Sequence, residues 1–166
     1  MTTADDITKS TRHSKIIGQF GEQMVCNWLS RCKFEAAIVD HTGLDIIAYR
    51  RKTGRLGITV KSRTRRACSE SEPVNLFSSR HKDRNKLVKA CAAFHCHPWI
   101  AVYVETSKYA DIYLTSLKHY DKIYRSKKTK QIEDWKMSPV FQKRYAEDTC
   151  VKHLHIDFVK TGWKWK

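Results

Sequence analysis

One segment near the middle of the chain restricts the fold more than any other feature. Residues 98–104 have the sequence Pro-Trp-Ile-Ala-Val-Tyr-Val and are apolar at odd and even positions alike. Because successive side chains of a strand point to opposite faces of a sheet, this run predicts a central strand that is buried on both faces. The rest of the chain must therefore supply layers that cover both sides of the sheet.

An amphipathic helix is the first of these layers. Apolar residues recur every three or four positions over 15–33, and Ser14 precedes them as a candidate N-cap. Gly18 and Gly21 lower helix stability, so they indicate close packing or the close approach of a partner. The predicted apolar stripe comprises Ile17, Phe20, Met24, Trp28 and Cys32.

Three β-rich segments separate this helix from the buried strand. They lie at 34–39, 44–49 and 56–61, and the last two form a hairpin around Thr53-Gly54. Residues 62–79 are basic and aperiodic, which predicts a loop.

The remaining segments alternate between helix and strand. They are a helix over 83–95, a strand over 111–114, short helices over 117–124 and 139–146 separated by a polar connector over 125–138, and a strand over 151–158. Together with the first half, this order predicts an α/β fold in which a central mixed β-sheet is flanked by helices.

A chain of 166 residues suits one ordinary domain. We expect a flexible polar arm over 1–14 and a single domain over 15–159, with its core at 15–118 and a C-terminal elaboration at 119–159. The basic tail 160–166 carries Trp163 and Trp165, which could stack on bases, insert into a membrane interface or pack on the core.

Charge and cysteine usage point to a partner and a compartment. The net charge of +15 favours a polyanionic partner. No run of about 18 apolar residues is present, so no membrane span is expected. The polar N-terminus lacks the apolar core of a signal peptide, and we interpret the six cysteines as reduced thiols of a cytoplasmic protein.

Acidic and basic residues meet at the predicted hairpin. Asp45 begins one strand and Lys61 ends the next, and a turn centred on residue 53 would place them opposite each other. Thr59 shares the face of Lys61 because the side-chain period of a strand is two. Glu22 lies at the edge of the apolar stripe of the first helix, from which it can approach Asp45 and Lys61.

Two carboxylates and a lysine suit metal-dependent phosphodiester cleavage. Carboxylate oxygens bind Mg²⁺, which activates water and neutralises charge in the transition state. A lysine can orient or deprotonate the attacking water, or stabilise the developing charge.

The sequence resembles the PD-(D/E)xK nuclease superfamily, which includes restriction endonucleases and archaeal Holliday-junction resolvases. The matching motifs are Gly18-Gln19-Phe20-Gly21-Glu22, Gly43-Leu44-Asp45-Ile46-Ile47-Ala48 and Ile58-Thr59-Val60-Lys61-Ser62. The resemblance implies a restriction-endonuclease-like sandwich and a DNA endonuclease that uses Mg²⁺ or Mn²⁺. By the same resemblance, Glu22, Asp45 and the Val60 carbonyl bind the metal and Lys61 is catalytic. Members of the superfamily often dimerise to cut two strands, so a homodimer is a possible assembly.

Thr59 departs from the superfamily pattern, which has a second acid at this position. A hydroxyl is a weak, neutral ligand, so we expect Thr59, the fourth proposed catalytic residue, to lower the affinity of the site for metal. The alternative is a weakly active or inactive nucleic-acid-binding module, or an accessory subunit, with the same fold. For Asp45 and Lys61 the simpler interpretation is a surface ion pair, and for Glu22 it is a solvated helix residue.

Basic clusters without balancing acids favour contact with DNA, or with RNA as a variant. The cluster Arg63, Arg65 and Arg66 follows Lys61 in the sequence and could contact the phosphates beside the scissile bond. The residues that we expect to contact nucleic acid are Arg63, Arg65, Arg66, Arg80, Lys82 and Arg84.

Two other kinds of site are disfavoured. Cys91, His95, Cys96 and His97 lack the paired spacing of a zinc knuckle, and addition of Cys150, His153 and His155 does not change this. Ser62 has no His or Asp at a recognised spacing for a serine nucleophile.

Overall fold

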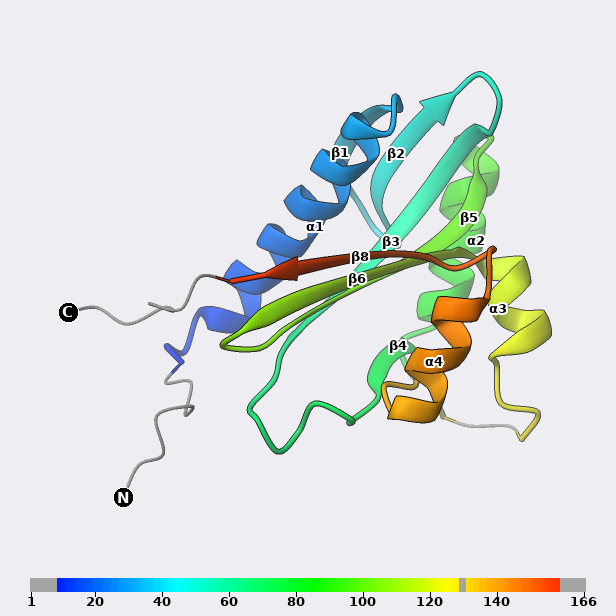
Figure 1. The fold of residues 1–166 in the computed structure, drawn as a ribbon. Coiled ribbons are helices and arrows are strands. Elements are labelled where there is room, and N and C mark those ends of the chain that lie inside the picture. The colour runs from blue at the N-terminus through cyan, green and yellow to red at the C-terminus, as the bar shows by residue number, and fades with distance from the viewer. Residues whose placement is uncertain (1–8, 129–130, 159–166) are drawn as a thin grey trace.

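A six-stranded mixed sheet forms the centre of the protein (Figure 1). In the computed structural model, residues 9–128 and 131–158 are described. The strand order is β1-β2-β3-β5-β6-β8, in which only β3 and β5 are parallel neighbours. The strands are β1 (Glu35–His41), β2 (Leu44–Arg50), β3 (Gly54–Thr64), β5 (His97–Glu105), β6 (Tyr109–Ser116) and β8 (Lys152–Asp157). The predicted central strand is confirmed, because β5 lies between β3 and β6 and is buried from Ile100 to Glu105.

Helices cover both faces of this sheet, as predicted (Figure 1). The long helix α1 (His13–Arg31) packs on one face. The helices α2 (Asp83–Ala93), α3 (Leu117–Ile123) and α4 (Pro139–Glu147) pack on the other. No helix within the described ranges is long and apolar enough to cross a membrane.

A second, two-stranded sheet lies in segments that were predicted as loop and connector. It pairs β4 (Val74–Ser78) with β7 (Ile132–Trp135), so both of those predictions were wrong in part. Each strand is short, and its pairing partner lies more than fifty residues away in the sequence. Their stability comes from tertiary burial, since Trp135 is only 1% exposed and its ring stacks on Tyr145 at 4.2 Å.

The first helix differs from its prediction in its start and in its buried face. It begins at His13, and Ser14 lies exposed inside it, so neither the Ser14 cap nor the limit of the arm at residue 14 is correct. Residues 1–8 and the tail 160–166 lie outside the described residues. The buried stripe is Ile17, Gly21, Val25 and Leu29, whereas Phe20 and Cys32 of the predicted stripe are exposed.

The two glycines of α1 play different roles, which a matched pair of substitutions can separate. A Cβ on Gly21 would lie 2.1 Å from Ser62 Oγ, whereas a Cβ on Gly18 would meet nothing within 4 Å. We expect Gly21→Ala to destabilise the protein by about 1–3 kcal/mol through overpacking. Gly18→Ala should stabilise it by about 0.5–1 kcal/mol. Urea unfolding checks both, and equal effects of the two changes would contradict this assignment.

Candidate active site

The register of the β2–β3 hairpin determines which residue lies beside Asp45. Ile46 pairs with Ile58 and Arg50 with Gly54, so the next position along places Asp45 beside Thr59. The prediction that Asp45 lies directly opposite Lys61 was therefore wrong by two residues. Gly54, with φ of +85°, ends the turn instead of lying at its centre. A shift of two preserves the side-chain period, so Asp45, Thr59 and Lys61 still share one face.

The carboxylate of Asp45 is held by two donors from β3. The backbone N–H of Val60 donates to Oδ2 at 2.6 Å, and the Thr59 hydroxyl donates to the same oxygen at 3.0 Å. Within the described residues, Oδ1 accepts no hydrogen bond. Since the N–H and C=O of a strand residue point to the same edge, the Val60 carbonyl is directed to the Asp45 side of β3. Asp45 thus has a fixed orientation and one available oxygen.

Glu22 approaches this carboxylate from the helix. It follows Gly21, whose lack of a side chain allows α1 to lie against Ser62 and Tyr103 of the sheet. Burial raises the pKa of Glu22 above its ordinary value, and the negative charge of Asp45 raises the pKa further. Two partly desolvated carboxylates that repel each other form a favourable environment for a cation. The donor set therefore fits a hard divalent metal such as Mg²⁺.

Lys61 lies two residues beyond Thr59 on the same face of β3 and is half-buried. It forms no ion pair with Asp45 or Glu22 within the described residues, so the simple cross-strand ion pair is not what the structure contains. Its ammonium group is available for a substrate or a water molecule. Ser62 points the other way and is buried beneath Gly21, which leaves it inaccessible as a nucleophile.

The predicted nucleic-acid contacts fall into two groups. Arg63, Arg66, Arg80 and Lys82 are exposed. Arg65 is buried and Arg84 is half-buried, and the guanidinium groups of both bind partners within the protein. Arg65 donates to the Glu72 carboxylate at 2.9 Å and to the Pro73 carbonyl at 2.8 Å.

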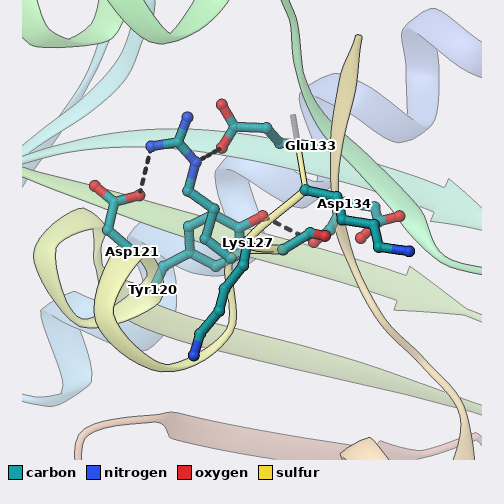
Figure 2. A pocket seen from close by; sticks show the side chains of 8 residues that line it. Tyr120, Asp121, Lys127, Glu133 and Asp134 are labelled. Carbon is teal, nitrogen blue, oxygen red and sulfur yellow. Dashed lines mark hydrogen bonds and ion pairs between the residues drawn. The ribbon is translucent and has the colours of Figure 1, made fainter. Parts of the chain in front are cut away.

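Arg84 of α2 belongs to an ion network that includes Asp121 of α3 and Glu133 of β7. Its Nε donates to Glu133 at 2.8 Å and its Nη2 to Asp121 at 2.8 Å. Asp121 and Glu133 also line a cavity of about 320 Å³ between α3 and β7, together with Tyr120, Lys127 and Asp134 (Figure 2). No residue of the three sequence motifs lines this cavity. We therefore assign the network to the cohesion of α2, α3 and β7.

The thiol and imidazole groups at the end of α2 do not converge on a common point. Cys91 is buried, its thiol donates to the Gly57 carbonyl, and burial raises its pKa to about 11. Among the described residues, the groups of His, Cys, Asp and Glu that lie close enough to share a metal ion include neither Cys91 nor His95. A packed core thiol, as the sequence suggested, accounts for this region.

The architecture resembles a known nuclease fold. No family model and no curated protein sequence matches the chain. Among solved structures, it is similar to Hjc, a Holliday junction resolvase from the archaeal hyperthermophile Archaeoglobus fulgidus, with a TM-score of 0.54 and 19% identity. The similarity covers 76% of this chain and 88% of the resolvase chain. It confirms the predicted restriction-endonuclease-like α/β sandwich, the fold of the superfamily that the motifs resemble.

Proposed function

We propose that this protein is a metal-dependent endonuclease that hydrolyses phosphodiester bonds in DNA. The observation that supports the proposal most directly is the pair of acids Glu22 and Asp45, since the charge of Asp45 raises the pKa of Glu22 and the Asp45 carboxylate is bonded to Thr59 and Val60, which precede Lys61 in β3. Glu22, Asp45 and Lys61 come from α1, β2 and β3 of a fold similar to that of a Holliday junction resolvase. The net charge of +15 adds the electrostatic attraction that a DNA substrate requires.

Each residue has a role that follows from its chemistry. Glu22, Asp45 and the Val60 carbonyl would hold Mg²⁺ or Mn²⁺, which when bound neutralises charge on the phosphate and activates water. The hydrogen bonds from Thr59 and Val60 keep the Asp45 carboxylate oriented. Lys61 would orient the attacking water and stabilise the developing negative charge. Arg63 and Arg66 follow directly and would hold the neighbouring phosphates.

The substrate and the assembly are part of the same proposal. Because the similar structure is a Holliday junction resolvase, a four-way DNA junction is the first substrate to test, with RNA as a variant. A homodimer would place two such sites on one substrate. We place the activity in the cytoplasm, since all six cysteines are free.

A cleavage assay tests the proposal. The full chain is incubated with end-labelled junction, duplex and single-stranded DNA, and with RNA, in Mg²⁺, in Mn²⁺ or in EDTA. We expect metal-dependent cleavage of DNA that EDTA abolishes. Salt-dependent binding without cleavage in either metal would instead support the second candidate, a nucleic-acid-binding module with this fold. That candidate is favoured by one observation, namely that Thr59 supplies a hydroxyl donor to Asp45 where the superfamily has an acid.

Restoring an acid at residue 59 provides a second prediction. Thr59→Asp adds a carboxylate beside Asp45, so it should tighten Mg²⁺ binding by about tenfold, or about 1.4 kcal/mol. Calorimetric titration of the metal measures this directly. Thr59→Val, which keeps the shape but removes the hydroxyl, is the matched control and should not tighten binding. Unchanged affinity in Thr59→Asp would place the metal away from residue 59.

A further inference from the structure

A second cluster of metal-ligating side chains lies at the other edge of the sheet, outside the candidate active site. Asp111 is on β6, and His153 and His155 are on the edge strand β8. We propose that these three residues form a site for a transition-metal ion of the Zn²⁺ class. The sequence alone disfavoured zinc at these histidines and did not include Asp111, so the proposal rests on the folded arrangement.

The strand register brings the three ligands together. Asp111 pairs with His155, and Tyr113 with His153, so the two histidines alternate along β8 and project from the same face as Asp111. His153 Nε2 and His155 Nδ1 each lie 2.7 Å from Asp111 Oδ1. A metal ion could replace the protons that now link these atoms, because the three ligand atoms all lie within 4.8 Å of one another.

The environment of Asp111 favours a bound cation. Its side chain is only 10% exposed, and a buried carboxylate needs a positive partner or several hydrogen bonds. Two imidazoles and one carboxylate match catalytic zinc sites, which use three protein ligands and leave a position for water. The side chain of His155 is 47% exposed, which provides access for that water and for the ion.

Neighbouring side chains hold both imidazoles in position. The second ring nitrogen of His155, Nε2, lies 3.2 Å from an oxygen of Asp157. A carboxylate on the other nitrogen is the usual partner of a metal-binding histidine. The ring of His153 stacks on Tyr113 with centroids 4.6 Å apart and an interplanar angle of 2°. The site therefore has an outer layer of supporting contacts as well as its three ligands.

This site is separate from the candidate active site and differs in its metal preference. Two rows of paired residues run across the sheet from β3 through β5 and β6 to β8. They are Lys61–Val102–Tyr113–His153 and Arg63–Val104–Asp111–His155. Three strand spacings, roughly 14 Å, therefore separate the histidines from β3. Imidazole nitrogens favour Zn²⁺ and similar ions, whereas oxygen-only sites suit Mg²⁺. An ion here would tie the edge strand β8 to β6.

Metal titration of the full-length protein tests the proposal. After EDTA treatment and removal of the chelator, calorimetry with ZnCl₂ should show a saturable site that excess Mg²⁺ does not occupy, and Zn²⁺ should raise the melting temperature. The double change His153→Ala with His155→Ala should weaken binding by more than about 100-fold. The change His81→Ala with His97→Ala removes two exposed imidazoles elsewhere and should have no effect.

Two further measurements keep the outcome decisive. The pair His153→Gln with His155→Gln retains hydrogen-bond donors toward Asp111, so it should remain folded by circular dichroism and still lose Zn²⁺. Co²⁺ absorption locates the ion, because a thiolate band would place it instead at the neighbouring group His119, Asp148 and Cys150. Unaltered Zn²⁺ affinity in the folded Gln pair, a thiolate band, or no saturable binding would overturn the proposal. None of these readouts depends on nuclease activity.

Discussion

Replacing Asp45 with asparagine is expected to reduce metal-dependent cleavage about a thousandfold while leaving DNA affinity nearly unchanged. A metal ion contributes several kcal/mol of transition-state charge stabilisation, and each 1.36 kcal/mol corresponds to about tenfold in rate. The asparagine oxygen can still accept the hydrogen bonds that Thr59 and Val60 now donate, so the hairpin should keep its structure. The change thus removes the charge of the metal ligand and little else.

The measurement is single-turnover cleavage beside an equilibrium binding assay on the same labelled DNA. Lys61→Met should likewise abolish cleavage, and Lys52→Met is its matched control, because Lys52 is an exposed cation in the turn of the same hairpin. Full cleavage by both Asp45→Asn and Lys61→Met would rule out this active site. Loss of DNA binding in Asp45→Asn would show that the substitution disturbs more than the metal site.

Replacing Arg84 with methionine is expected to lower the free energy of unfolding by about 2 kcal/mol. The Arg84 side chain is 19% exposed, and its guanidinium group binds Glu133 and Asp121 at once. The same group lies over the Phe77 ring, 5.0 Å from its centroid. Removal of Arg84 leaves Glu133 with Arg125 as its remaining cation, at 3.3 Å. The expected cost is therefore below the roughly 3–5 kcal/mol of breaking a fully buried pair.

Urea denaturation checks this value, and DNA binding by the folded variant separates a structural role from a substrate contact. Arg80→Ala is the control, since Arg80 is exposed and lies four residues away. It should change stability by less than about 0.5 kcal/mol but weaken DNA binding and lower its salt dependence. If Arg84→Met unfolds at the wild-type urea concentration, the network does not hold α2, α3 and β7 together.

The sequence was sufficient for features that depend on local periodicity. The double-sided apolar run at 98–104 identified the central strand and, with it, the need for helices on both faces. The period of two in β3 placed Thr59 and Lys61 on one face, and this held although the register differed by two residues. The motif around Glu22, Asp45 and Lys61 was enough to predict the fold.

Only the tertiary structure decided which of these residues meet. The neighbour of Asp45 depended on where Gly54 closes the turn, and the approach of Glu22 depended on the packing of Gly21 against Ser62. The pairing of Arg84 with Glu133 joins positions 49 residues apart. Local sequence determines the spacing of apolar and polar side chains within one helix or strand. Contacts such as Arg84 with Glu133 arise only when distant segments are buried together. For the same reason Asp111 and the two histidines of β8 form a cluster only in the folded sheet.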